Sequence, residues 1–182
     1  NPQNVEQELL DAWERDGTYS FNPDTHKEIF SIDTPPPTMS GNMHLGHAFS
    51  FSQQDFIARY KRMQGYEVFY PFGTDDNGLA SEKLVQKKKK VNGARMDRQE
   101  FIDLCMEYLN EARPAFIADW KRIGMSCDFE LQYSTINDHC RAVSQKSFLD
   151  LVKKERAYRK EAPVIWDTQF QTAIAQAELE SV

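Results

Sequence analysis

The sequence contains no apolar run near the ~20 residues that a membrane-spanning helix needs. Cysteine is scarce: the 182 residues include only Cys105, Cys127 and Cys140, and no two of them have C-x-x-C spacing. An odd, scattered set of this kind favours reduced thiols over a disulfide framework. We therefore expect a cytoplasmic protein with no membrane as a partner.

The chain also lacks an excess of positive charge. Its 22 lysine and arginine residues are outnumbered by 28 aspartate and glutamate residues, which gives a formal net charge of −6. A domain that holds a nucleic acid by itself should present a basic surface. This chain is therefore not expected to be a main nucleic-acid-binding surface. No internal repeat or low-complexity linker divides the sequence, so we expect a single domain.

The chain is organised around a predicted strand, a rigid loop and a helix. The apolar side chains between Ile29 and Ile32 predict a strand over residues 28–34. Three prolines at 35–37 end this strand, and a helical pattern then runs over residues 48–64. This order places unpaired backbone N–H groups at the start of a helix, which is a ready binding site for an anion.

Two histidines stand at the start of this helix. His44 and His47 flank Gly46, so both imidazoles can donate hydrogen bonds to one ligand, and the glycine lets that ligand approach the backbone. We interpret the strand, the loop and the histidines as a site for nucleotide phosphate. Two alternatives remain: an ordinary surface or core pair, or a metal site. A metal site needs a third and a fourth ligand, and no nearby pair of cysteines, or of a histidine and a glutamate, supplies them.

A second strand and a second loop follow. The sequence predicts a strand at 66–70, so that strand, helix and strand form a right-handed unit with two parallel strands. Ligands of such sheets bind at the carboxyl ends of the strands. The loop over residues 73–78 should therefore face the proline–histidine loop across one crevice.

Asp75 and Asp76 lie in this second loop, between Gly73 and Gly78. A carboxylate at the crevice can bind the ammonium group of a substrate through charge-assisted hydrogen bonds. The alternative is a solvated Asp/Asn turn, which the composition of the loop also fits. Because both loops are predicted to face one crevice, we favour the binding site.

The spacing of apolar residues predicts the packing of two helices. An amphipathic helix at about 3–17 should lie across the core. The helix at 48–64 should carry a surface ion pair between Asp55 and Arg59, which are four residues apart. Its core contacts are expected to be Phe49, Phe56, Ile57, Tyr60 and Met63.

Further elements are expected in the second half of the chain. Helices are predicted at 79–92 and at 97–123, and Pro114 should break or kink the second of them. A third helix should begin after Asn137, with inward-facing Val143, Phe148, Leu149 and Val152. The segments expected to be extended are 133–135 and an edge strand at 158–166, and residues 171–179 fit either the start of a strand or a short helix.

The prolines Pro35, Pro36 and Pro37 are followed by Gly41 and by His44-Leu45-Gly46-His47, an order that resembles the first signature of the class I aminoacyl-tRNA synthetases. Residues 72–79, which read FGTDDNGL, resemble the loop after the second strand in the valyl, isoleucyl and leucyl branch. Residues 162–167, 171–173 and 177–180 are similar to the valyl members of that branch. The resemblance covers nearly the whole chain.

This resemblance implies an α/β fold with a Rossmann-like parallel sheet. Residues 1–182 would be the amino-terminal part of the class I catalytic domain, ending before its editing insertion. The implied reaction is ATP-dependent activation of valine to valyl-adenylate, followed by transfer to tRNA(Val). The resemblance also implies that Mg²⁺ accompanies ATP without dedicated protein ligands, and that the parent enzyme is monomeric.

The resemblance also implies a role for each matching residue. His44 and His47 would be the catalytic phosphate donors, and Gly41 and Gly46 would join them in binding ATP. Asp75 would hold the amino group of the amino acid. The rest of the amino-acid pocket would consist of Pro35, Pro36, Pro37, Asn77 and Gly78.

The second signature of the family, a K-M-S-K-S loop, is absent from the sequence. The lysine run at 87–90 does not match it and is interpreted as a solvated helix end. We therefore expect half of a split active site, inactive or feeble alone. The alternatives are a module that binds ATP or an aminoacyl-adenylate without turnover, an isoleucyl- or leucyl-type fragment, and a small adenylyltransferase. Against the last stand the 73–78 loop and the segment from Trp166 to Ala173.

Overall fold

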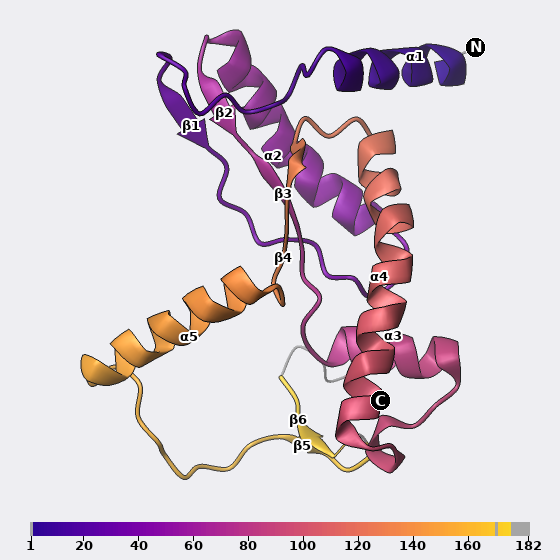
Figure 1. Ribbon diagram of the computed structural model, residues 1–182, viewed down its shortest axis with the longest axis vertical. Coiled ribbons are helices and arrows are strands. Elements are labelled where there is room, and N and C mark those ends of the chain that lie inside the picture. Colours follow the sequence, from indigo (N-terminus) through magenta and orange to yellow (C-terminus); the bar gives the residue numbers. More distant parts are fainter. Residues whose placement is uncertain (1, 170, 176–182) are drawn as a thin grey trace.

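The computed structural model describes residues 2–169 and 171–175, which form a mixture of helices and short strands (Figure 1). The elements in chain order are α1 (Pro2–Arg15), β1 (Ile29–Ser31), α2 (Leu45–Met63), β2 (Glu67–Phe69), β3 (Pro71–Thr74), α3 (Leu79–Lys89), a 3₁₀ turn η1 (Gly93–Arg95), α4 (Arg98–Arg122), β4 (Asp128–Ser134), α5 (Asp138–Lys153), β5 (Trp166–Asp167) and β6 (Thr172–Ala173). This is the expected α/β order.

The first four strands are parallel pairs built along one central segment. β1 pairs with β2, and β3 pairs with β4. Only Tyr70 separates β2 from β3. The carbonyl of Phe69 accepts a hydrogen bond from Ile32 on the β1 side, whereas the next carbonyl, that of Tyr70, accepts one from Asp128 on the β4 side. Successive carbonyls of an extended chain point to opposite edges, so β1 and β4 flank the central segment. The predicted parallel strand–helix–strand unit is confirmed.

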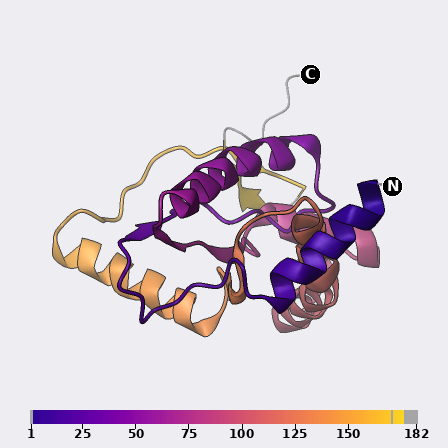
Figure 2. The same ribbon diagram turned by 90° about the horizontal axis from the view of Figure 1, so that it is seen from above.

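Aromatic side chains fix the helices against these strands. Trp120 of α4 is completely buried. Its ring centroid lies 4.7 Å from that of Phe51 on α2 and 5.9 Å from those of Phe72 on β3 and Phe116 on α4. α2 and α5 lie on opposite sides of the strands (Figure 2). Trp120 therefore fixes α2 and β3 against α4.

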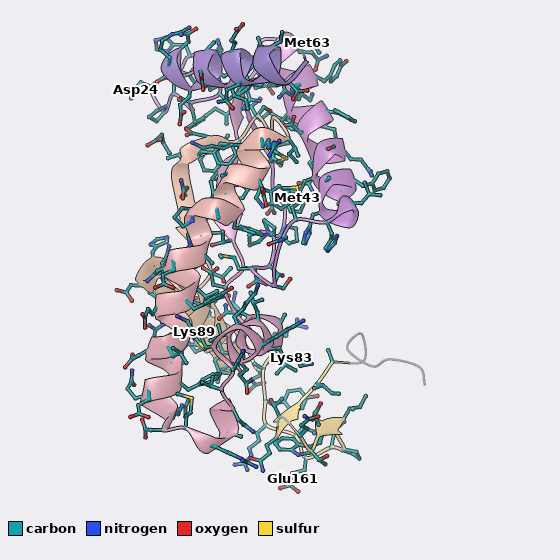
Figure 3. The ribbon with its side chains drawn as sticks, turned by 90° about the vertical axis from the view of Figure 1, so that its right-hand side faces the viewer. Asp24, Met43, Met63, Lys83, Lys89 and Glu161 are labelled. Carbon is teal, nitrogen blue, oxygen red and sulfur yellow. The ribbon has the colours of Figure 1, made fainter. Side chains whose placement is uncertain are left out.

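The apolar face predicted for α2 is wrong. The five side chains expected in the core are all exposed: Phe49, Phe56, Ile57, Tyr60 and Met63. Figure 3 shows side chains along α2, between Met43 and Met63, projecting away from the body of the molecule. The inward face carries Asp55 and Ala58, both buried, together with the partly buried Phe51.

A polar network explains this reversal. The predicted ion pair exists, with 2.7 Å between Arg59 Nε and Asp55 Oδ2, but it is not on the surface, because Asp55 is only 6% exposed. The backbone N–H and the hydroxyl of Ser126 donate to Asp55 Oδ1 at 2.7 and 2.6 Å. A buried carboxylate is stable where its lone pairs are satisfied in this way. The turn before β4 therefore binds the polar face of α2, and the aromatic face is left outside.

The second half of the chain differs more from the prediction. α5 has no buried residue, and Val143, Phe148, Leu149 and Val152, expected to face inward, are exposed. Figure 1 shows this helix standing away from the strands. The strand expected at 158–166 is wrong, because only its last residue belongs to β5. β6 supports a strand start at 171–179, of which residues 176–179 lie outside the described residues.

Two other helices agree with their predicted positions. Asp97 caps α4 by accepting hydrogen bonds from the backbone of Gln99 and Glu100, but Pro114 does not break this helix, which has buried residues on both sides of the proline. α1 packs through its last turns, where Trp13 meets Tyr19 at 5.3 Å between ring centroids.

The described helices do not meet the requirements of a lipid bilayer. None of those within residues 2–169 and 171–175 combines the length and the apolar character needed to cross a membrane.

Candidate functional site

The two predicted loops lie side by side. Thr38 and Asp75 form an isolated parallel bridge, in which the N–H of Asp75 donates to the carbonyl of Pro37 at 2.8 Å and the N–H of Met39 donates to the carbonyl of Asp75 at 2.9 Å. The predicted closeness of the two loops is confirmed, whereas a single crevice shared by His44, His47 and Asp75 stays a prediction. A cavity of about 260 Å³ is lined by Pro36 and Pro37 of the first loop and by Gly73 of the second, but not by His44, His47 or Asp75.

The two histidines form a stacked pair at the first turn of α2. Their ring centroids are 3.8 Å apart, with 17° between the ring planes. His44 is the N-cap, and its Nδ1 accepts a hydrogen bond from the backbone N–H of His47 at 3.4 Å. The helix therefore begins at Leu45, three residues before the predicted start, and the capping imidazole satisfies one of the N–H groups that a helix start leaves free.

Burial, and secondarily the neighbouring His44, lower the pKa of His47 below its ordinary value of 6.5. Its ring is tilted toward Trp120 at 5.8 Å between centroids, which places the imidazole against the aromatic core. Near pH 7 it is therefore a neutral imidazole, able to donate one hydrogen bond.

Gly46 has a close neighbour inside the protein. A Cβ at this position would lie 3.1 Å from Cε1 of His44, so the glycine leaves room for the capping imidazole. The room for a ligand that the sequence suggested is thus occupied, in part, by a side chain of the site. Gly41 is exposed, with φ +144, in the turn before α2.

The adjacent carboxylates of the second loop have different surroundings. Asp75 is half-buried; its Oδ1 accepts hydrogen bonds from Asn77 N and Thr135 Oγ1, both at 3.2 Å, and its Oδ2 accepts one from Thr38 Oγ1 at 3.3 Å. The bond from Asn77 is the Asp/Asn turn that the composition also indicated. The Asp/Asn turn and the oriented carboxylate of Asp75 are therefore both present in this loop.

Asp76 points inward. Its side chain is 0% exposed, and its Oδ2 accepts hydrogen bonds from Thr74, Ser134 and Arg113. Of the other predicted residues, Pro35, Asn77 and Gly78 are exposed, whereas Pro37 is buried. Gly78 has φ +89 and is the N-cap of α3.

Sequence reasoning missed several residues around the second loop. Thr38 directly follows the proline run, and its place in the first loop could have identified it as a partner for the second loop. Thr135 and Tyr133 belong to a segment predicted only as extended. Arg113 reaches Asp76 from 37 residues away and has no local signal in the sequence.

The donor set suits an anion better than a metal. Within residues 2–169 and 171–175, no three His, Cys, Asp or Glu side chains are grouped so that they could hold a metal ion. The first loop ends in a helix start with two imidazoles, and the second loop, which is bridged to the first, carries one half-buried carboxylate. It offers hydrogen-bond donors to phosphate at one end and an acceptor to an ammonium group at the other.

The chain belongs to the class I tRNA synthetases (I, L, M and V), whose family pattern it matches over residues 8–182. It is 48% identical over 175 residues to the valine–tRNA ligase of Thermoplasma volcanium, 46% over 176 residues to that of Rickettsia conorii and 47% over 178 residues to that of Anaplasma marginale. These alignments cover 96%, 96% and 98% of the chain but 22% of each relative. The chain thus spans about a fifth of the length of these relatives.

A solved structure supports the fold. The chain matches the leucyl enzyme in the crystal structure of an Agrobacterium radiobacter K84 agnB2 LeuRS–tRNA–LeuAMS complex, with a TM-score of 0.74 and 24% identity over 95% of this chain and 21% of that one. The predicted class I α/β fold and the resemblance to this family are confirmed.

Proposed function

We propose that this chain is the first half of the catalytic domain of a valine–tRNA ligase, which activates valine with ATP and transfers it to tRNA(Val). The observation that carries the proposal is the joint placement of an oriented carboxylate, Asp75, and a histidine-capped helix start at neighbouring loops. Similarity to three valine–tRNA ligases supports valine as the amino acid.

Asp75 is the proposed ligand of the valine ammonium group. Among the described residues, no lysine, arginine or histidine forms an ion pair with it, and its recorded partners are neutral donors. Charge-assisted hydrogen bonds to an ammonium would therefore add the missing countercharge. Pro35, Pro36 and Pro37, with Asn77 and Gly78, are the proposed walls of the same pocket.

The first turn of α2 is the proposed phosphate end. Free backbone N–H groups at the helix start favour an anion, and His44 and His47 add side-chain donors. Gly41 and Gly46 are the proposed places of close approach by ATP. Mg²⁺ bound with ATP would supply further positive charge to the phosphates.

The proposed reaction depends on the positioning of the two substrates more than on covalent catalysis by the protein. A carboxylate oxygen of valine attacks the α-phosphorus of ATP, the bond to the β-phosphate oxygen breaks, and pyrophosphate leaves. Asp75 would anchor one end of the nucleophile while the histidine-capped turn would stabilise charge on the phosphate. Because the sequence has no K-M-S-K-S loop, we expect the chain alone to bind ligands but to turn over feebly.

Valine-dependent exchange of pyrophosphate into ATP by the full-length protein tests this function. We expect exchange with valine above isoleucine and leucine, and a loss of roughly 10²–10³-fold in kcat/KM for His47→Asn. His139→Asn, at an exposed histidine of α5, is the matched control and should keep full activity. A preference for isoleucine or leucine would contradict the assignment to valine, and full activity of His47→Asn would contradict the phosphate site.

A further inference from the structure

We infer that Arg113 is a positioning residue for the amino-acid end of the crevice and acts through Asp76, an inference that rests on the proposed function. Arg113 lies on α4, and its side chain is 24% exposed. Its Nη2 is 3.0 Å from Asp76 Oδ2. It forms a charge pair with the carboxylate next to the proposed ammonium ligand and has no recorded contact with Asp75 itself.

Asp76 ties the second loop to three elements. Its Oδ2 accepts hydrogen bonds from Thr74 of β3 at 3.0 Å, from Ser134 of β4, and from Arg113 of α4. Arg113 is the one cation in this group, and the carboxylate is shut off from water. An uncompensated charge in such a place is costly, so the loop would leave its position if the arginine were lost.

Thr135 connects the buried carboxylate to the exposed one. Its hydroxyl accepts a hydrogen bond from the backbone N–H of Asp76 at 3.1 Å and donates one to Asp75 Oδ1 at 3.2 Å. A shift of Asp76 therefore moves the donor that orients Asp75. The same shift would pull on the bridge between Asp75 and Thr38, which holds the two loops together.

The phosphate end is held by further contacts of its own. His44 caps its own helix, and α2 is held by Phe51 against Trp120 and by Asp55 against Ser126. No contact recorded for the described part of the chain joins Arg113 to either histidine. Loss of Arg113 should thus weaken binding of the amino acid far more than binding of ATP.

The test compares four variants of the full-length protein by amino-acid-dependent pyrophosphate exchange: Arg113→Met, Arg113→Lys, Asp76→Asn/Arg113→Met, and the control Arg98→Met at an exposed arginine of the same helix. Arg113→Met should raise KM for valine by about tenfold or more while KM for ATP changes less than about threefold. Arg113→Lys and the double variant should recover much of the valine KM, because the first restores a cation and the second removes the unpaired charge.

Three results would overturn the inference: a valine KM for Arg113→Met equal to that of Arg98→Met, a parallel rise in both KM values, or no recovery in the double variant. The wild-type protein separates this inference from the proposed function. If it exchanges pyrophosphate with a different amino acid, the assignment to valine fails, and the same KM comparison is made with that amino acid.

Discussion

Gly73 of β3 and Tyr133 of β4 are register partners, and the tyrosine ring lies directly over the glycine. A Cβ on residue 73 would be 2.1 Å from Cζ of Tyr133, closer than any side chain allows. Both residues line the cavity of about 260 Å³ that is also lined by Pro36 and Pro37. The glycine therefore sets the position of one wall of this cavity.

Gly73→Ala should force the tyrosine ring out of place. We expect a loss of about 1–3 kcal/mol in the free energy of unfolding, measured by urea denaturation, which is typical of overpacking. In a Tyr133→Ala background the same substitution should cost much less, because the ring is absent. Equal costs in the two backgrounds would show that the ring contact does not decide the residue at 73.

Asp55→Ala should be strongly destabilising. It leaves Ser126 and Arg59 without their buried acceptor, and removal of one member of such a network costs about 3–5 kcal/mol. Gln53→Ala, at an exposed position of the same helix, should stay within about 0.5 kcal/mol of the wild type in the same urea titration. If the two variants unfold at the same urea concentration, the network does not hold α2 in place.

Two phenylalanines test which face of α2 is inside. Phe51 packs edge-on against Trp120, and Phe51→Ala should cost about 3 kcal/mol or more; Phe56 is 67% exposed, and Phe56→Ala should cost less than about 0.5 kcal/mol. Thermal unfolding of the two variants gives the comparison directly. The reverse order of stability would restore the orientation that hydrophobic spacing predicted.

The exposed apolar side chains of α2, which include Phe49 and Phe56, should also make the 182-residue chain associate with itself. Among the described strands, β1 pairs only with β2, so one strand edge is open in addition to this apolar surface. Sedimentation velocity should show a concentration-dependent increase in mass, and the double variant Phe49→Ser/Phe56→Ser should reduce it. A wild-type chain that stays monomeric at all concentrations would contradict this expectation.

The titration of His47 gives a further prediction. Because burial and His44 lower its pKa in the folded state, the unfolded chain takes up a proton first as the pH falls below 6.5. The stability due to His47 is therefore fully present above pH 6.5 and is lost as the pH falls toward the lowered value. An NMR titration should find its pKa below 6.5, and higher, though still below 6.5, in His44→Gln. A pKa at or above 6.5 in the wild type would be inconsistent with the stacked, half-buried ring.

Local sequence signals predicted the placement of the two loops better than they predicted how the helices pack. Prolines follow β1, a glycine follows α2, and parallel strands bring their carboxyl ends together, so the two loops could be placed from short stretches of sequence. The orientation of α2 could not, because Asp55 and Ser126, which decide it, are 71 residues apart and leave no mark on hydrophobic periodicity. For the same reason the spacing in α5 predicted an inward face that the described part of the chain does not cover.

Calorimetric titration of the full-length protein with a non-hydrolysable valyl-adenylate analogue tests the central claim most directly. We expect tight binding by the wild type, weaker binding of the isoleucyl analogue, and at least about a tenfold loss of affinity in Asp75→Ala, since a charged hydrogen bond to the ammonium is removed. Asp138→Ala, at a fully exposed acid, should bind as the wild type does. Equal affinity of Asp75→Ala and the wild type would contradict the claim that this carboxylate holds the amino acid.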